Sequence, residues 1–326
     1  MKTLKIQAYK AGHVRIESAE LPQPGENEVL VETLFSAISP GTELAWLNHM
    51  ENTPGIFPYY PGYSGCGKVV GKGEQVTEFD VGDLVLAKLK HWSRDIVEAD
   101  GCMRLPEDVG PKEASPFCLA SISLQGIRKA DIQIGDRVAV LGLGAIGNLA
   151  AQLAFVAGAG SVTGFDFIEW RRMLAGKCGV IKTEADGNRE EHQNKYDVVI
   201  EATGAPSAIN TALQMVMPLG TVVLLGSTRG LTDGVNFYRD VHVKGITMVG
   251  AHTIRRSVSS EDRFGHFRSV KQDEETVVSL LQNRRIIIEP LISELVDPGD
   301  AQIIYDRLFA KEDGLMLAVF KWNKTK

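Results

Sequence analysis

The chain has 326 residues, of which 44% are hydrophobic and 23% are charged, and its formal net charge is −6. This length indicates two domains of ordinary globular composition. The acidic balance argues against nucleic acid as a partner. A membrane span would need about 18 consecutive apolar residues, and the sequence contains no such run. We therefore expect a protein that acts on a small molecule.

Residues 1–120 carry short segments that alternate apolar and polar residues, such as 28–36, separated by Pro-Gly turns. Such alternation predicts half-buried strands, and many short strands with these turns predict a compact β-rich domain. The chain enters a strand-like pattern at once, so we expect no secretory signal. Its four cysteines form no CxxC pair, which favours reduced thiols in a cytoplasmic protein.

A glycine-rich loop follows a buried strand at 138–142 and precedes a helix at 148–158. Gly142 allows a tight turn, Gly144 lets the backbone approach a pyrophosphate, and Gly147 lets the helix lie close to the sheet. The free N–H groups at the start of such a helix bind phosphate. The spacing predicts a dinucleotide-binding site, and a plain turn in an α/β domain is the alternative.

The next strand, at 161–166, ends on Asp166, 19 residues after the last glycine of the loop. A carboxylate there accepts hydrogen bonds from ribose hydroxyls and repels a 2′-phosphate, so we expect NAD as the cofactor. Arg171 and Arg172 complicate this choice, because a guanidinium near the ribose tolerates a phosphate. The expected cofactor-binding residues are Gly142, Gly144, Ala145, Ile146, Gly147, Asp166, Arg171, Thr203, Gly204 and Gly226.

Two further core strands are predicted at 196–201 and 221–226, the second after a turn at 218–220. Strands that alternate with helices over 135–250 predict a parallel, doubly wound sheet and an α/β fold. Nearer the C-terminus, residues 274–283 have the pattern of an amphipathic helix. A strand is expected to follow from residue 286.

The chain resembles the medium-chain dehydrogenase/reductase superfamily, the alcohol dehydrogenase-like proteins with a GroES-like N-terminal domain. The glycine loop lies in the expected place, and the other matching segments are 21–31, 37–43, 61–70 and 79–85. The resemblance covers essentially the whole chain and is nearest to the branch that contains bacteriochlorophyllide dehydrogenase. It implies a homo-oligomer, dimeric or tetrameric, with a GroES-like catalytic domain at 1–120, a Rossmann domain at 121–254 and a return of the catalytic domain at 255–326.

The same resemblance exposes a departure at the catalytic metal. Zinc-containing members place a Cys and a His where this chain has Pro40 and Tyr63, and the neighbouring acid is replaced by Ser64. Cys118 falls near the third ligand position. Because a catalytic zinc needs about three protein ligands, we expect no metal. The alternative is a rebuilt site made by His49, His91 and Cys118.

Without zinc, hydride transfer still needs a side chain that moves the hydroxyl proton. Tyr63 offers a phenol that donates to a carbonyl oxygen, or that accepts a proton if its pKa is depressed. Thr42 corresponds to a proton-relaying hydroxyl in relatives, and His49 and His252 offer imidazoles. For each of these four candidates a purely structural role is the alternative. We expect Glu43 to be structural, in a buried pair with an Arg or Lys.

The sequence thus favours a zinc-independent oxidoreductase that transfers hydride between NAD and a secondary alcohol or ketone, with a polyol or sugar-like substrate. One alternative is an NADPH-dependent quinone or enoyl reductase, against which Asp166 argues. A third hypothesis is a dinucleotide-binding protein that has lost its activity together with the metal.

Overall fold

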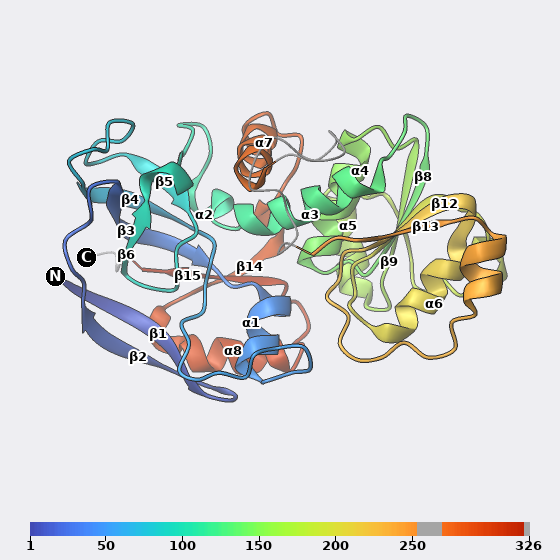
Figure 1. Ribbon diagram of the computed structural model, residues 1–326, viewed down its shortest axis with the longest axis horizontal. Helices are drawn as coiled ribbons and strands as arrows, with labels where there is room; N and C mark the ends of the chain where they lie inside the picture. The colour runs from blue at the N-terminus through green and yellow to red at the C-terminus, as the bar shows by residue number, and fades with distance from the viewer. Residues whose placement is uncertain (253–268, 323–326) are drawn as a thin grey trace. The chain divides into compact units, whose positions relative to one another are not determined.

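The computed structural model describes residues 1–252 and 269–322. The chain divides into two compact units, drawn in Figure 1. Unit 1 consists of Met1–Leu119, Val278–Asn283 and Leu291–Lys326, and unit 2 consists of Ala120–Val277 and Arg284–Pro290. Unit 1 is therefore assembled from segments that lie far apart in the sequence.

Unit 1 is built mainly of antiparallel strands. A hairpin joins β1 (Lys2–Lys10) to β2 (His13–Glu20). A seven-stranded sheet has the order β14-β15-β3-β4-β5-β7, and β6 also pairs with β3. Its strands are β3 (Glu28–Ala37), β4 (Gly65–Lys72), β5 (Leu84–Ala87), β6 (Arg94–Glu98), β7 (Met103–Arg104), β14 (Ile292–Val296) and β15 (Leu317–Lys321).

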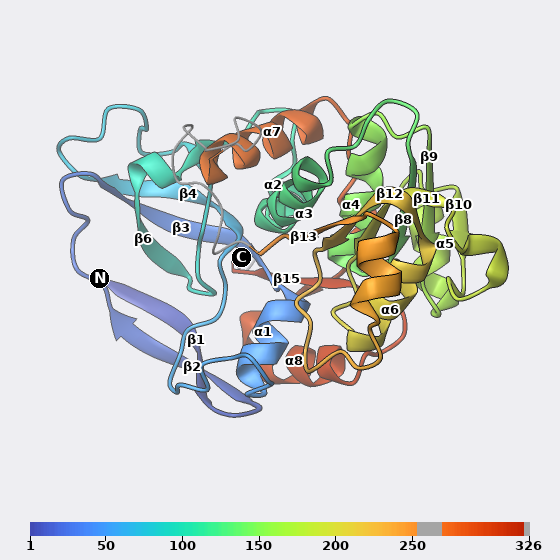
Figure 2. The same cartoon turned by 45° about the vertical axis from the view of Figure 1, so that its right-hand side comes forward.

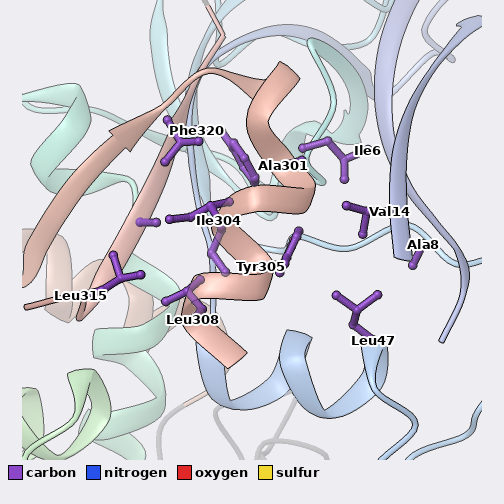
Figure 3. Close-up of a cluster of buried hydrophobic side chains, with 13 residues drawn as sticks. Ile6, Ala8, Val14, Leu47, Ala301, Ile304, Tyr305, Leu308, Leu315 and Phe320 are labelled. Atoms are coloured by element: carbon purple, nitrogen blue, oxygen red, sulfur yellow. The ribbon is translucent and has the colours of Figure 1, made fainter. Parts of the chain in front are cut away.

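The helices of unit 1 cover one core cluster, which Figure 3 shows at close range. They are α1 (Pro40–Leu47) and α8 (Ala301–Phe309), whereas α2 (Pro111–Ala114) packs against β3 and β4. In that cluster α8 places Ile304 and Tyr305 against Ile6 of the hairpin and Phe320 of β15. Burial of these large side chains is the main term that holds the segments of unit 1 together.

Unit 2 contains a six-stranded parallel sheet with the order β10-β9-β8-β11-β12-β13. Counted from β8, this is the 3-2-1-4-5-6 order of a doubly wound dinucleotide-binding sheet. The strands are β8 (Arg137–Leu141), β9 (Ser161–Phe165), β10 (Lys182–Glu184), β11 (Tyr196–Glu201), β12 (Val216–Leu224) and β13 (Thr247–Gly250). The predicted α/β fold class is confirmed.

Helices α4 (Ala145–Val156), α5 (Glu169–Lys177) and α6 (Pro206–Met215) pack against the strands of this sheet, as Figures 1 and 2 show. The π-helix η3 (Tyr238–Val243) contacts α6. The other helices are α3 (Phe117–Ala130) and α7 (Val270–Gln282), and each has residues in both units. The central strands are almost continuously apolar and fully buried, for example Val138, Val140 and Ile200. A parallel sheet with both faces covered requires such sequences.

The expected boundaries hold in part. The helix expected at 148–158 is α4, which begins at Ala145. The turn expected at 218–220 lies inside β12, where Leu219 adopts a positive φ of 68° and the pairing with β11 shifts register. The strand expected from residue 286 begins only at Ile292. In the segment before Ile292, the side chain of Gln152 hydrogen-bonds both the N–H and the C=O of Ile287, so these groups do not pair with a strand.

The sequence assigns everything from residue 255 onward to the return of the catalytic domain, whereas residues 270–277 pack with unit 2. The reason is an ion pair of 2.6 Å between Asp273 of α7 and Arg128 of α3, in which Asp273 is buried. All four cysteines are buried, and none of them forms a disulfide bond, as expected. In the described part of the chain, no helix has both the length and the apolar character that crossing a bilayer requires.

Candidate functional site

The glycine loop of unit 2 has the geometry that its residues predict. Gly142 has a φ of +86°, and a Cβ there would lie 2.7 Å from Thr203 Cγ2. A Cβ on Gly147 would lie 1.8 Å from the carbonyl oxygen of Gly142. Both positions therefore accept only glycine. A Cβ on Gly144, by contrast, would meet no atom within 4 Å, so the backbone faces open space there.

Helix α4 begins at this open side of the loop. Its N-cap is Gly144, and no side chain caps the helix. The N–H groups of the first turn, on Ala145, Ile146 and Gly147, have no intrahelical acceptor. Together with the helix dipole they form a site for a phosphate group. The loop and helix thus fit the pyrophosphate of a dinucleotide.

Asp166 lies directly beside the loop at the end of β9. Its Oδ2 accepts a hydrogen bond of 2.9 Å from the Leu143 N–H, and its Oδ1 accepts one of 2.9 Å from the Ile168 N–H. Each oxygen keeps a second lone pair for a ribose hydroxyl. Arg171 Nη1 lies 3.6 Å from Oδ2, and its buried Nε has no hydrogen-bond partner in the structure. The carboxylate of Asp166 and the guanidinium of Arg171 therefore lie next to each other beside the glycine loop.

The loop after β11 is organised by Glu201, a residue that the sequence reasoning missed. This buried carboxylate accepts hydrogen bonds from the backbone and the hydroxyl of Thr203 and from the Gly204 N–H. Burial raises the pKa of Glu201, and these hydrogen bonds oppose the rise. Gly226 packs against the same turn, since its Cβ would lie 2.4 Å from the Gly204 nitrogen. Thr203, Gly204 and Gly226 are thus neighbours. The sequence feature that could have identified Glu201 is an acidic residue at the end of a buried strand.

In unit 1, Tyr63 belongs to a group of three hydroxyls. Its phenol donates a hydrogen bond of 2.6 Å to Ser39 Oγ, and the hydroxyl of Thr42 lies near enough to lower the pKa of the phenol. Burial raises the pKa of Tyr63 well above its ordinary value, and the nearby charge of Glu43 adds to the rise. The hydrogen bonds to Ser39 and Thr42 act in the opposite sense. Tyr63 is therefore protonated at neutral pH, which favours a proton donor over a base.

Glu43, on α1, is buried, and its side-chain hydrogen-bond partners within residues 1–252 and 269–322 include no Arg or Lys, so the expected partner was wrong there. Its Oε1 accepts a hydrogen bond of 2.8 Å from the Ser39 N–H. Its Oε2 accepts 2.5 Å and 3.0 Å hydrogen bonds from the Tyr305 hydroxyl and from His91 Nε2. A buried carboxyl is tolerated where donors satisfy its oxygens in this way.

His91 continues this network toward the C-terminal strand. Its Nδ1 lies 2.8 Å from Ser36 Oγ, which also accepts a hydrogen bond of 2.8 Å from Trp322 Nε1. The hydroxyl proton of Ser36 then fits His91 Nδ1, and this assignment makes Nε2 the donor to Glu43. His91 is completely buried. His91 therefore donates a hydrogen bond to Glu43, and its ring is not exposed to bind a metal ion.

The two histidines expected near the reaction have other surroundings. His49 is exposed just after α1 with a φ of 49°, and its ring lies over Gly55. Among the residues described, the hydroxyl of Tyr63 donates its hydrogen bond to Ser39 and not to His49. His252 belongs to unit 2, is exposed, and its carbonyl oxygen accepts a hydrogen bond of 3.1 Å from Gln125 Nε2.

At the positions that hold zinc in relatives, this chain has residues that lack a ligand atom or hydrogen-bond the backbone. Pro40 begins α1 and has no ligand atom. Ser64 Oγ donates a hydrogen bond of 2.6 Å to the Ser115 carbonyl, and Cys118 Sγ donates one of 3.1 Å to the Tyr63 carbonyl. Across residues 1–252 and 269–322, metal-ligand atoms of three residues gather within 4.8 Å only at Glu184, Glu191 and His192, in unit 2. The alternative set of His49, His91 and Cys118 is not such a group.

Comparison with known proteins places this chain. Residues 145–264 match the family model of the zinc-binding dehydrogenases. The chain is 30% identical over 241 residues to D-guloside 3-dehydrogenase of Escherichia coli, an alignment that covers 71% of this chain and 68% of that protein. It is also 30% identical over 223 residues to 2-desacetyl-2-hydroxyethyl bacteriochlorophyllide A dehydrogenase of Rhodobacter capsulatus, covering 64% of this chain and 68% of the relative.

A solved structure shows the same fold over the full length. A Sinorhizobium meliloti protein described as a zinc-binding dehydrogenase, bound to NADP, superposes with a TM-score of 0.83 at 20% identity and covers 98% of this chain and 99% of its own. The fold is thus a GroES-like β-rich unit combined with a Rossmann unit, which defines an alcohol dehydrogenase-like oxidoreductase. The chain belongs to the zinc-binding dehydrogenase family.

Proposed function

We propose that this protein is a zinc-independent, NAD-dependent dehydrogenase that interconverts a secondary alcohol and a ketone. The observation that carries the proposal is the Tyr63 phenol, which takes the place of a metal ligand and is hydrogen-bonded to Ser39 Oγ at 2.6 Å. The relative of Escherichia coli oxidises a guloside at carbon 3, as its name states. We therefore propose a polyol or sugar-like substrate with several hydroxyl groups.

In this proposal the residues of unit 2 hold the cofactor. The first turn of α4 and the backbone at Gly144 bind the pyrophosphate, and Asp166 accepts hydrogen bonds from the adenosine ribose. A bound nicotinamide dinucleotide supplies the hydride donor or acceptor. The buried Glu201 fixes Thr203 and Gly204, which border the same end of the sheet. Ligands of such sheets bind at the carboxyl ends of the strands.

The proton is handled in unit 1. If a bound nicotinamide dinucleotide supplied hydride to the carbonyl carbon of a ketone, Tyr63 would give its proton to the carbonyl oxygen. The resulting phenolate is stabilised by the hydroxyls of Ser39 and Thr42 until it is protonated again from solvent. Oxidation of the alcohol reverses these steps. The raised pKa of Tyr63 keeps the donor form populated at neutral pH.

The residues at the former zinc positions do not fit the metal. Pro40 offers no ligand, the Tyr63 phenol is protonated, and Ser64 is bonded to the backbone. One thiol, that of Cys118, does not supply the three protein ligands that a catalytic zinc requires. No step of the proposed mechanism therefore passes through a metal.

A substrate screen tests the proposal directly. Purified protein would be mixed with NAD and with polyols, sugars, glycosides and secondary alcohols, and formation of NADH followed at 340 nm. We expect turnover with at least one hydroxylated substrate, without added metal. Tight NAD binding with no turnover would support the third hypothesis, a binding protein without catalytic activity.

A second candidate function rests on Arg171. Its buried Nε has no partner in the structure and its Nη1 lies 3.6 Å from Asp166 Oδ2, so the guanidinium is placed to bind a 2′-phosphate. The corresponding activity is an NADPH-dependent quinone or enoyl reductase, in which hydride is delivered to a conjugated carbon. Separate measurements of NADH and NADPH affinity distinguish the two candidates. A strong preference for NADPH would favour the reductase.

We also propose a homo-oligomer. Strand β13 ends the six-stranded sheet, and an edge strand can pair with the same strand of a second copy. Sedimentation analysis over a range of protein concentrations would measure the number of subunits, and a monomer at all concentrations would contradict the proposal.

A further inference from the structure

Ser39 has the position of a helix cap but does not act as one. It is the N-cap residue of α1, and its side chain makes no capping hydrogen bond. A serine at this position ordinarily accepts a hydrogen bond from an N–H of the first turn of its own helix. Here Ser39 Oγ instead accepts the hydrogen bond from Tyr63. The hydroxyl is thus withdrawn from the helix and directed at the candidate proton donor.

The reason lies in Glu43, which hydrogen-bonds both the backbone N–H and the backbone carbonyl of Ser39. Glu43 Oε1 accepts from the Ser39 N–H, and the Glu43 N–H donates to the Ser39 carbonyl at 2.9 Å. These two bonds fix the backbone of Ser39 on both sides. Pro40 follows directly and restricts its own φ and the backbone conformation of Ser39, so the point from which the Ser39 hydroxyl projects is fixed.

Glu43 is itself held from two distant parts of unit 1. His91 Nε2 and the Tyr305 hydroxyl both donate to its Oε2. Figure 3 shows Tyr305 projecting from α8 into the apolar cluster of unit 1. Glu43 is only 3% exposed, and a buried carboxyl that lost these donors would be strongly unfavourable. The network therefore has one stable arrangement.

A serine hydroxyl can serve both states of Tyr63. It accepts from the neutral phenol, as in the structure, and by rotating its own proton it donates to a phenolate oxygen. A buried phenolate needs such a donor at the moment it forms, because a donor that is already in place stabilises the developing charge. Resting on the function proposed above, we propose that Ser39 is a positioning residue for proton transfer by Tyr63, and that Glu43, held by His91 and Tyr305, sets the place of Ser39.

A structural role for Ser39 would give different results. Loss of a cap or a buried hydrogen bond lowers stability and adds to the effect of any other substitution. A residue that acts through Tyr63 alters turnover only while the Tyr63 hydroxyl is present. The two roles therefore differ in how the substitutions combine.

The experiment is a double-mutant cycle with Ser39→Ala and Tyr63→Phe on the full-length protein. We expect Ser39→Ala to lower kcat by about ten- to a hundredfold, at the lower end of or below the loss of about a hundred- to a thousandfold that follows removal of a donor to a developing negative charge. The KM for substrate and the Kd for NAD change little. In the Tyr63→Phe background, Ser39→Ala causes no further loss of kcat. Additive losses in the double variant would overturn the proposal.

Two further variants and one isotope measurement sharpen the test. Ser39→Thr keeps the hydroxyl and is expected to restore most of kcat. Ser93→Ala removes a hydroxyl of unit 1 that is bonded to the Leu4 N–H, and it is expected to leave kcat unchanged. The solvent deuterium isotope effect on kcat is expected to rise in Ser39→Ala, because proton transfer then limits the rate more strongly. An unchanged isotope effect together with a lowered melting temperature would assign Ser39 to structure.

The support from Glu43 is tested through His91→Gln, which keeps a hydrogen-bonding side chain. We expect kcat to fall while NAD affinity is preserved, and no additional fall when Ser39→Ala is added. An independent loss in that pair would remove Glu43 from the proposal. Failure of this inference is separable from failure of the proposed function. A fully active Tyr63→Phe would overturn both, whereas an impaired Tyr63→Phe with a normal Ser39→Ala would overturn this inference alone.

Discussion

Tyr305 donates a hydrogen bond of 2.5 Å to the carboxyl group of Glu43, although 262 positions separate the two residues in the chain. Tyr305 lies on α8 and Glu43 on α1, and both are buried. Burial and the neighbouring carboxyl raise the pKa of Tyr305 far above its ordinary value, so the phenol is a permanent donor. The contact joins the first and last segments of unit 1 through a polar bond inside an apolar cluster.

Tyr305→Phe should therefore destabilise unit 1. Removing the hydroxyl leaves Glu43 with one donor fewer in a buried place, at a cost of about 1–3 kcal/mol. Urea unfolding followed by tryptophan fluorescence measures this loss, since three tryptophans belong to unit 1: Trp46, Trp92 and Trp322. The exposed Tyr9→Phe is the matched control, and equal stability of the two variants would contradict the assigned role of the bond.

Tyr63→Phe is expected to leave NAD affinity intact and to lower kcat by about ten- to a thousandfold, since a positioned proton donor is lost. The measurements are NAD binding by fluorescence titration and steady-state kinetics with the best substrate from the screen. Full activity in this variant would assign Tyr63 to packing in the place of the metal.

Substitution of Asp166 by Ala or Ser should weaken NAD binding and relax the discrimination against NADP. The carboxylate that accepts from the ribose hydroxyls is lost, and Arg171, 3.6 Å from Asp166, becomes available to a 2′-phosphate. Dissociation constants for NADH and NADPH would be compared in the wild type and the variant. Arg171→Ala in the Asp166→Ser background should remove the acquired NADPH affinity. An unchanged ratio would contradict the ribose assignment.

Protein purified without added zinc should contain substoichiometric zinc, and a strong chelator should not lower kcat. The residues at the former ligand positions supply a single thiol. Metal content would be measured by mass spectrometry alongside activity. His192→Gln is the control, because it removes a ligand from the Glu184, Glu191 and His192 group. Zinc that survives this substitution in full occupancy and is needed for turnover would contradict the mechanism.

Stability should fall steeply in alkaline solution. Burial raises the pKa of the Cys66 thiol to about 12 and that of Cys178 to about 11. In the unfolded chain these thiols ionise near pH 9. Above that pH the unfolded state binds fewer protons than the folded state and is stabilised relative to it. Each such group contributes a loss of about 1.4 kcal/mol per pH unit until its folded pKa is reached.

The slope of unfolding free energy against pH between about 9 and 11 checks this reasoning. Cys66→Ala should lower that slope by the share of one thiol, whatever its effect on stability at neutral pH. A slope that is the same in the variant and in the wild type would show that Cys66 ionises equally in both states.

The glycine loop and the parallel sheet were predictable because their determinants are local. Gly142, Gly144 and Gly147 lie within six residues, and each glycine answers a backbone requirement at its own position. The apolar runs of β8 and β11 likewise follow from burial on both faces. The strand expected from residue 286 was wrong because a side chain, that of Gln152, bonds the backbone there.

The proton-handling group was predictable only in part. The sequence singles out Tyr63 and Thr42 through the changed metal positions, but it does not show Ser39, because a serine before a helix ordinarily caps that helix. The partners of Glu43 come from His91 and Tyr305, 48 and 262 residues away, and no local pattern encodes such pairing. An Arg or Lys was expected there, and the imidazole of His91 and the phenol of Tyr305 take its place.

Strand β15 lies between β14 and β3, so the sheet begun by residues 28–37 is closed by residues 317–321. During translation, β4 and β6 are made soon after β3, but the third neighbour of β3, β15, emerges from the ribosome only after most of the chain has been made. The intervening Rossmann segment is complete by then. Nascent chains stalled short of residue 317 should therefore bind dinucleotide yet remain protease-sensitive before residue 119.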